Sequence, residues 1–198
     1  MAYQMFHDAL IKGPDVSLSA SQLKNLPYAA SYARLGDEPR AMVVLARVKG
    51  DERIWVSRDH EYLFTRHGRL VRTDGLKKAN LKRLHFDGGD PLASGLGGLA
   101  KVHYQSKGTI DLMPDYRYGL PFIAHYKIVG HSRIVIANRS MLLTQVDETF
   151  AIPDMNYRIV NHYWMDNKGL IWKSIQRPIP SLPAITLTLI KPYQQDIH

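Results

Sequence analysis

The sequence contains no cysteine, which excludes disulfides, thiolate metal ligands and cysteine nucleophiles. It also lacks any hydrophobic run close to the about 20 residues that a membrane-spanning helix needs. The longest apolar stretches are Met42–Ala46 and Ile134–Ala137. With 198 residues, of which 45% are hydrophobic and 22% charged, the chain has the composition of one folded domain rather than of a disordered protein.

Motifs that would mark a catalytic, metal or cofactor site are missing as well. The nine histidines form no H-E-x-x-H pattern, and no G-x-S-x-G elbow is present. Gly95–Ala100 fits G-x-G-x-x-G/A, but a dinucleotide site needs a strand before this motif and a long helix after it. Here a loop precedes the motif and a strand-like segment follows. We therefore predict no catalytic residue, no metal and no cofactor, and we do not expect an enzyme.

Basic residues are concentrated in one stretch of the chain. The chain carries a net charge of +8, and Arg66–Arg83 holds seven basic residues against one acid, Asp74. Such a stretch can bind a polyanion, although it can also be an ordinary solvated face. No nucleic-acid-binding signature accompanies it, so we expect no nucleic acid partner. The candidate polyanion contacts are Arg69, Arg72, Lys77, Lys78, Lys82 and Arg83.

Arg69 and Arg72 cannot both face solvent if they lie on one regular strand. Successive side chains of a strand point to opposite faces, so Arg69 and Arg72 point in opposite directions. One of them must lie on an inner face, at a barrel rim, or paired with an acid. The cations from Lys77 to Arg83 are expected to follow a turn at Asp74-Gly75 and to reach solvent.

The hydrophobic pattern predicts short helices near the start of the chain and strands after them. Helical spacing favours a helix over Tyr3–Ile11, and Ser19 with Gln22 forms a capping box for a second helix that ends before Pro27. The predicted strands are Ala41–Lys49, Arg53–Ser57, Glu61–Thr65, Arg69–Thr73, Lys101–Tyr104, Ile110–Met113, Phe122–Val129, Arg133–Asn138, Met141–Ala151, Tyr157–Met165, Leu170–Gln176 and Ala184–Lys191.

The breaks between these strands are short and carry turn residues. Asp166–Gly169 should form a tight turn that pairs Trp164–Met165 with Trp172–Ser174. Gly130-His131 should separate two strands, and the glycine-rich segment Asp87–Leu99 should be an irregular surface loop with one helical turn at Pro91–Ser94. The pattern indicates a mainly β protein: a single-domain antiparallel β-barrel or barrel-like sandwich with a few short helices.

Three stretches, in order, resemble one family. The first is Leu26–Gly36 (LPYAASYARLG) followed by Met42–Ala46. The second runs from Ile54–Ser57 (IWVS) through Gly68–Leu76 (GRLVRTDGL) to Asp90-Pro91-Leu92, and the third from Tyr163–Asp166 (YWMD) through Trp172–Gln176 (WKSIQ) to Lys191-Pro192. Together they resemble the YjbF/GfcB-type group 4 capsule lipoproteins of Gram-negative bacteria, over roughly residues 16–193.

The resemblance implies one YjbF/GfcB-like domain over residues 1–198, in which 1–15 is a helical lead-in after a removed signal and lipid-anchor segment. It implies export, lipid attachment at an N-terminal cysteine and a place in the cell envelope, as an outer-membrane lipoprotein that faces the periplasm. The implied partners are acidic polysaccharide, other capsule or exopolysaccharide secretion proteins, and the membrane through the anchor. The family offers no catalytic residues to carry over.

The expected function is therefore a non-enzymatic accessory lipoprotein in capsule or exopolysaccharide assembly or export. The alternative is a periplasmic barrel that carries a lipid or another apolar ligand, and an enzyme that acts on the polysaccharide comes third. An open apolar cavity would favour the carrier. A cleft with two carboxylates about 5–9 Å apart would favour the hydrolase, and a packed barrel with neither would favour the accessory role.

Overall fold

The computed structural model describes residues 15–99 and 105–196, which form a mainly β architecture. The strands are β1 Ala30–Leu35, β2 Ala41–Lys49, β3 Glu52–Val56, β4 Tyr62–Arg66, β5 Arg69–Asp74, β6 Asn80–Phe86, β7 Gln105–Met113, β8 Arg117–Ile136, β9 Arg139–Ile152, β10 Tyr157–Met165, β11 Ile171–Gln176 and β12 Ile185–Lys191. The helical segments are α2 Ala20–Asn25, α3 Gly95–Leu99 and the 3-10 turns η1 Pro91–Ser94, η2 Pro153–Met155 and η3 Gln194–Asp196.

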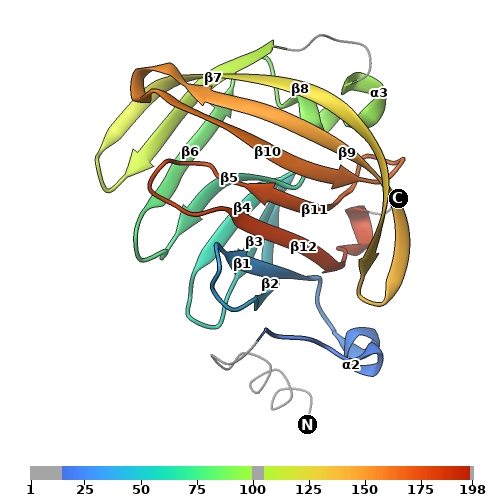
Figure 1. Ribbon diagram of the computed structural model, residues 1–198. Helices are drawn as coiled ribbons and strands as arrows, with labels where there is room; N and C mark the ends of the chain where they lie inside the picture. The colour runs from blue at the N-terminus through green and yellow to red at the C-terminus, as the bar shows by residue number, and fades with distance from the viewer. Residues whose placement is uncertain (1–14, 100–104, 197–198) are drawn as a thin grey trace.

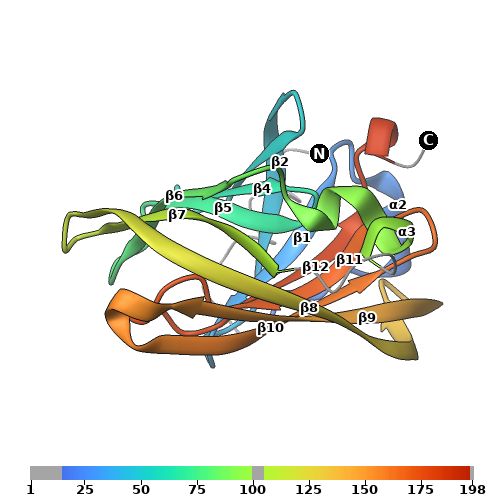
Figure 2. The ribbon, with the colours of Figure 1, turned by 90° about the horizontal axis from the view of Figure 1, so that it is seen from above.

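All strands belong to one antiparallel sheet that curls into a nearly closed barrel (Figures 1 and 2). The order across the sheet is β5-β4-β3-β2-β1-β12-β11-β10-β9-β8-β7-β6. The first and last strands of the chain therefore pair in its middle, with Ala33 opposite Leu187. The predicted fold class, an antiparallel barrel with a short helix near the N-terminus, is confirmed.

The seam between β5 and β6 is joined by side chains. The backbone N–H of Leu81 donates to the hydroxyl of Thr73 at 2.9 Å. The Asn80 side chain accepts from the Leu76 N–H at 3.1 Å and donates to the Leu76 carbonyl at 3.0 Å, which fixes the connection between the two strands. These bonds hold the two ends of the curled sheet against each other.

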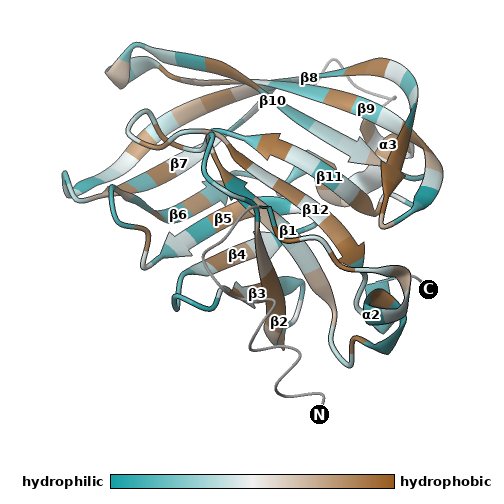
Figure 3. Ribbon diagram, turned by 60° about the horizontal axis from the view of Figure 1, so that its bottom comes forward, coloured by the Kyte–Doolittle hydropathy of each residue, from teal (hydrophilic) through white to brown (hydrophobic). Residues whose placement is uncertain are grey.

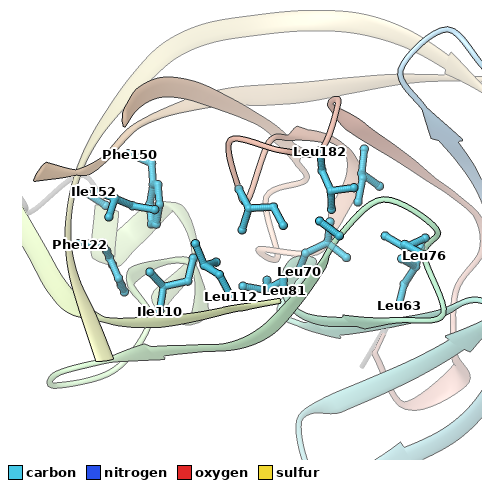
Figure 4. Close-up of a cluster of buried hydrophobic side chains, with 14 of the residues drawn as sticks. Leu63, Leu70, Leu76, Leu81, Ile110, Leu112, Phe122, Phe150, Ile152 and Leu182 are labelled. Carbon is cyan, nitrogen blue, oxygen red and sulfur yellow. The ribbon is translucent and has the colours of Figure 1, made fainter. Parts of the chain in front are cut away.

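Alternation along the strands fills the inside of the barrel. Figure 3 shows hydrophobic and hydrophilic positions following one another along the strands, as period-two side-chain placement requires. The largest buried cluster includes three phenylalanines, of which Phe122 and Phe150 lie at one end in Figure 4. The ring of Phe122 packs edge-on against Phe86 at 4.9 Å and stacks on Phe150 at 4.8 Å. One part of the barrel interior is thus solidly packed.

A second cluster lies where α2 covers the sheet. Ser19 caps this helix and forms the predicted capping box with Gln22, so that prediction is confirmed. Leu18 and Leu26, which flank the helix, are buried against Ile136 and Leu143 from the β8–β9 hairpin. The helix is thereby fixed to the end of that hairpin.

The predicted break at Gly130-His131 is wrong. The segments expected as two strands form the single 20-residue strand β8, which pairs with β9 on both sides of Gly130. The register shifts between Ile128 and Gly130, and Gly130 has a φ of 152°. The glycine therefore accommodates a bulge inside a continuous strand.

The prediction of an irregular surface loop over Asp87–Leu99 is also wrong, except for its helical turn at Pro91–Ser94. Asp90 caps this turn by accepting from the Leu92 N–H at 3.0 Å. Leu92 and Leu99 are buried at 1% and 6% exposure in a third cluster. Because their apolar side chains need a partner, the segment folds onto the barrel.

The predicted hairpin turns are present. In the β10–β11 hairpin, Tyr163 lies opposite Ser174 and Trp164 opposite Lys173, across the turn at Asp166–Gly169.

Strands β1 and β6 were not predicted. The predicted helix at Tyr3–Ile11 and the predicted strand at Lys101–Tyr104 lie outside the described residues. Within the described ranges, no helix has the length and apolar character needed to cross a membrane.

We predict that Gly108→Ala lowers the free energy of unfolding by about 2 kcal/mol, the usual scale for overpacking a core. A Cβ on Gly108 would overlap the backbone oxygen of His85 and come within 2.8 Å of the Phe122 ring. Gly97→Ala is the control, because a Cβ there meets nothing within 4 Å, and alanine in a helix should change stability by less than about 1 kcal/mol. Urea unfolding measures both. Equal midpoints would contradict the packing argument.

Candidate functional site

The basic run occupies β5, the β5–β6 connection and β6. Lys77 and Lys78 lie in the connection, Lys82 and Arg83 on β6, and all four are exposed. Lys82 and Arg83 both reach solvent because the pairing of β6 with β7 shifts register between Leu81 and Arg83. Such a bulge interrupts the alternation of inward and outward side chains. The structure thus exposes four of the predicted contacts within residues 77–83, and we call these four residues the β6 face (Lys77, Lys78, Lys82 and Arg83).

The other two predicted contacts differ from these four. Arg72 is half-exposed, pairs with Asp74 at 3.0 Å and lies over the ring of Phe64. Arg69 is 1% exposed, so its prediction as a surface polyanion contact is wrong. Regular alternation is not the reason, because Arg69, Leu70 and Val71 are all buried and the pairing of β5 with β4 shifts register between Leu70 and Arg72. Arg69 is held inside by its ion pairs with Asp90 and Glu148.

Arg69 is the centre of a buried polar cluster inside the barrel. Its Nε donates to Asp90 at 2.6 Å, and its Nη1 donates to Glu148 at 2.7 Å. The guanidinium also lies 4.7 Å from the ring centroid of Phe86, in a cation–π arrangement. Burial alone would lower the pKa of Arg69, but the charges of Asp90 and Glu148 raise it well above its ordinary value. Arg69 is therefore a permanent buried cation.

Glu148 accepts hydrogen bonds from the rest of the cluster. It is fully buried, and its two oxygens accept from Tyr126 at 2.8 Å, Asn161 at 2.8 Å and Tyr163 at 3.0 Å. Burial raises the pKa of Tyr126 and of Tyr163, so both phenols stay protonated and act as donors. A buried ion pair is stable only when its remaining donors and acceptors are satisfied, and this one meets that condition.

A cavity of about 370 Å³ opens inside the barrel near this cluster. Its wall includes Ser31 of β1, Trp55 of β3, Thr65 of β4 and Ser174 of β11, together with Leu187 of β12. The indole N–H of Trp55 donates to the Thr65 hydroxyl at 2.9 Å. Residues 92–95, which the Asp90–Arg69 ion pair helps to hold, form another part of the wall. The lining mixes apolar and hydroxyl groups.

The charged groups that line the cavity include two carboxylates, each held by a cation. Arg53 donates hydrogen bonds to the carboxylate of Asp196, and this interaction raises the pKa of Arg53. Asp51 lies 3.6 Å from the ring of His67 and 3.7 Å from Arg66. Both carboxylates are therefore engaged in ion pairs. The cavity combines hydrogen-bonding and apolar surface, which suits a polar organic ligand better than a purely apolar one.

Two further motif predictions can be compared with the geometry. In the described part of the chain, no group of three or more His, Asp or Glu side chains could hold a metal ion. The glycine motif at Gly95 belongs to α3, which directly follows the turn η1 rather than a strand. That arrangement lacks the strand–turn–helix geometry of a dinucleotide site.

The cluster and the cavity were not predicted from the sequence, although one signal was present. Val146, Phe150 and Ile152 occupy the inward positions of β9 and are buried, and Glu148 lies in the same register. A carboxylate within an alternating apolar set indicates a buried charge that needs a partner. The cavity residues come from separate strands with no local motif.

Comparison with known proteins supports one family. A sequence model described as "Group 4 capsule polysaccharide lipoprotein gfcB, YjbF" matches residues 3–190. Two relatives from Escherichia coli K12 are an uncharacterized lipoprotein GfcB, 26% identical over 94% of this chain and 87% of its own length, and an uncharacterized lipoprotein YjbF, 28% identical over 95% and 87%. The crystal structure of the hypothetical lipoprotein YmcC from the same organism superposes with a TM-score of 0.78, at 24% identity over 96% of this chain and 94% of that one.

We predict that Arg69→Met destabilises the fold by about 3–5 kcal/mol, because it leaves Glu148 buried without its cation. Arg158→Met is the control, since it removes an exposed arginine of β10 and should cost less than about 1 kcal/mol. The double variant Arg69→Met/Glu148→Gln should be destabilised by less than the sum of the destabilisations of the two single variants. Urea unfolding of the four proteins tests this, and an additive cycle would contradict the coupling.

A second prediction concerns alkaline pH. Burial raises the pKa of Tyr157 to about 12, and its hydroxyl donates to the Arg177 carbonyl. Since the folded pKa exceeds the unfolded value of about 10, the contribution of Tyr157 is full below pH 10. It is lost as the pH rises toward 12. Between pH 10 and pH 12, the free energy of unfolding should therefore fall by about 1 kcal/mol less in Tyr157→Phe than in the native protein, the scale for a half-buried group. Parallel pH dependences of both proteins would refute this.

Proposed function

The chain belongs to the group 4 capsule polysaccharide lipoprotein family of GfcB and YjbF, and from this premise we propose that it is a non-enzymatic accessory lipoprotein. Its role would be the assembly or export of capsule or exopolysaccharide. Membership in a lipoprotein family implies a membrane-anchored place in the cell envelope. We place it on the outer membrane, facing the periplasm, with other secretion proteins of the same polysaccharide as partners.

The observation that carries this proposal is the β6 face. Four cations lie exposed within seven residues, two in the β5–β6 connection and two at the bulge of β6. Arg83 keeps its partner Asp111 at 2.8 Å, and the three lysines extend the positive charge beyond that pair. A group of exposed cations attracts polyanions through a long-range field. Acidic polysaccharide is the polyanion that the family context supplies.

The cavity bears on the alternative, a carrier of a lipid or another apolar ligand. Hydroxyls of Ser31, Thr65 and Ser174 and the charges of Arg53 and Asp51 contribute to its lining. Thr65 and Ser174 already accept from Trp55 and Gln176, and Arg53 and Asp51 are in ion pairs. An apolar ligand would still remove water from these polar and charged groups, which costs free energy. The mixed lining therefore favours the accessory role over the apolar carrier. The ion-paired state of Asp51 and Asp196 supports a non-enzymatic role, since a glycosidase uses one carboxyl group as an acid and the other as a base or nucleophile.

The test is retention on an anionic polysaccharide matrix as the salt concentration rises. The variant K77E/K78E/K82E/R83Q changes the β6 face and avoids placing a carboxylate next to Asp111. It should elute at lower salt than the native protein. The slope of log affinity against log salt should fall by about one for each anionic group of the polymer that the variant no longer binds.

The matched control removes the same total charge from another surface. K127E/R133E/R158E/R139Q alters exposed cations of β8, β9 and β10 and should elute like the native protein. Equal elution of the β6-face variant and the native protein would mean that this face is only solvated. An equal decrease in retention of both variants would mean that net charge, and not the β6 face, determines retention.

A further inference from the structure

The β8–β9 hairpin extends beyond the sheet that it belongs to. Strand β10 pairs with β9 only from Thr144 to Ile152, whereas β9 itself begins at Arg139. Residues 139–143 pair with residues 132–136 of β8 alone. Figures 1 and 2 show this end of the hairpin projecting at the side of the barrel. We call residues 131–143 the hairpin arm.

The two faces of the hairpin arm differ in what covers them. On the inner face, Ile136 and Leu143 are 2% and 1% exposed, in the cluster that contains Leu18 and Leu26. On the outer face, Val135 and Leu142 are 70% and 61% exposed. Since Val135 lies opposite Ser140 and Leu142 opposite Arg133, these four residues share the outer face. The arm is thus hydrophobic on its exposed face as well as on its buried one.

The charge of the arm has a single sign. Residues 131–143 include the exposed Arg133 and Arg139 and contain no acidic residue. Arg133 shares the outer face with Val135 and Leu142, whereas Arg139 lies opposite Ile136 and over the ring of Trp172. Strands that project at an edge usually carry polar groups that keep them from associating. A projecting hairpin that instead exposes Val135 and Leu142 beside Arg133 has the composition of an interfacial membrane-binding element. Apolar side chains enter the acyl boundary in such elements while cations bind the headgroups.

We propose that the hairpin arm docks on an anionic lipid surface, with Val135 and Leu142 inserted below the headgroups and Arg133 bound to lipid phosphate. Charge complementarity favours lipid over a protein surface, because the arm offers cations without any acid to pair with a mixed-charge partner.

The position of the arm also favours a lipid surface. Leu18, close to the first described residue, belongs to the same buried cluster as Ile136 and Leu143 on the inner face of the arm. A lipid anchor attached before these residues would hold the arm next to the bilayer. This part of the argument rests on the anchor assigned under the proposed function.

The arm and the β6 face lie on opposite sides of the barrel (Figures 1 and 2). A protein docked through the arm would therefore turn the β6 face away from the bilayer. The two surfaces can be tested separately, since no residue is shared between them.

The experiment is vesicle flotation of this 198-residue chain, which carries no lipid. We expect binding to vesicles of phosphatidylethanolamine and phosphatidylglycerol, and much weaker binding to phosphatidylcholine vesicles. The variant V135S/L142S should lower the partition coefficient by about tenfold. R133Q should lower it by about fivefold. V160S/Y118S, which changes exposed apolar residues outside the arm, is the matched control and should float like the native protein.

Three outcomes would overturn the proposal. One is equal flotation of V135S/L142S and the native protein. Another is the absence of flotation with either lipid mixture. The third is a concentration-dependent dimer in sedimentation that V135S/L142S abolishes, because the arm would then be covered by a second copy of the chain. The arm is independent of the polysaccharide role if V135S/L142S keeps its retention on the anionic matrix and the β6-face variant keeps its flotation.

Discussion

The buried ion pair between Arg69 and Glu148 is the interaction on which the interior of this barrel depends. It links β5 to β9, while Tyr126, Asn161 and Tyr163 bind the same carboxylate from β8 and β10. Neither charge could remain inside the barrel without the other. The packed apolar part of the interior and the cavity therefore coexist in one fold because this cluster satisfies the polar groups between them.

The same arginine shapes the cavity. Asp90 both caps the turn η1 and pairs with Arg69, and the residues that follow Asp90 form part of the cavity wall. The segment from Asp90 to Leu99 is glycine-rich, and its position is fixed by this ion pair and by the burial of Leu92. A substitution at Arg69 would thus alter both the stability of the barrel and the shape of its cavity.

Local chemistry explains which parts of the fold the sequence predicts. The β10–β11 hairpin and the capping box at Ser19 depend on turn and cap residues that are neighbours in sequence. Strand β6 was missed because its bulge exposes Lys82 and Arg83 in succession, which hides the alternation. Strand alternation indicates that Arg69 or Arg72 must be internal, but it cannot identify Glu148, which lies on a strand far along the chain. The cavity has no local signal, since its wall comes from β1, β3, β4, β11 and β12.

The pairing of β1 with β12 also has a consequence for the order of folding. Every other ladder in the sheet joins strands that follow one another in sequence, whereas this one joins the two ends of the chain. Until β12 has been synthesised, β1 presents an unpaired edge that can associate with another polypeptide. A chain released before its last strand would have two open edges, at β1 and at β11. Truncation near the C-terminus should therefore produce aggregation rather than a smaller stable barrel.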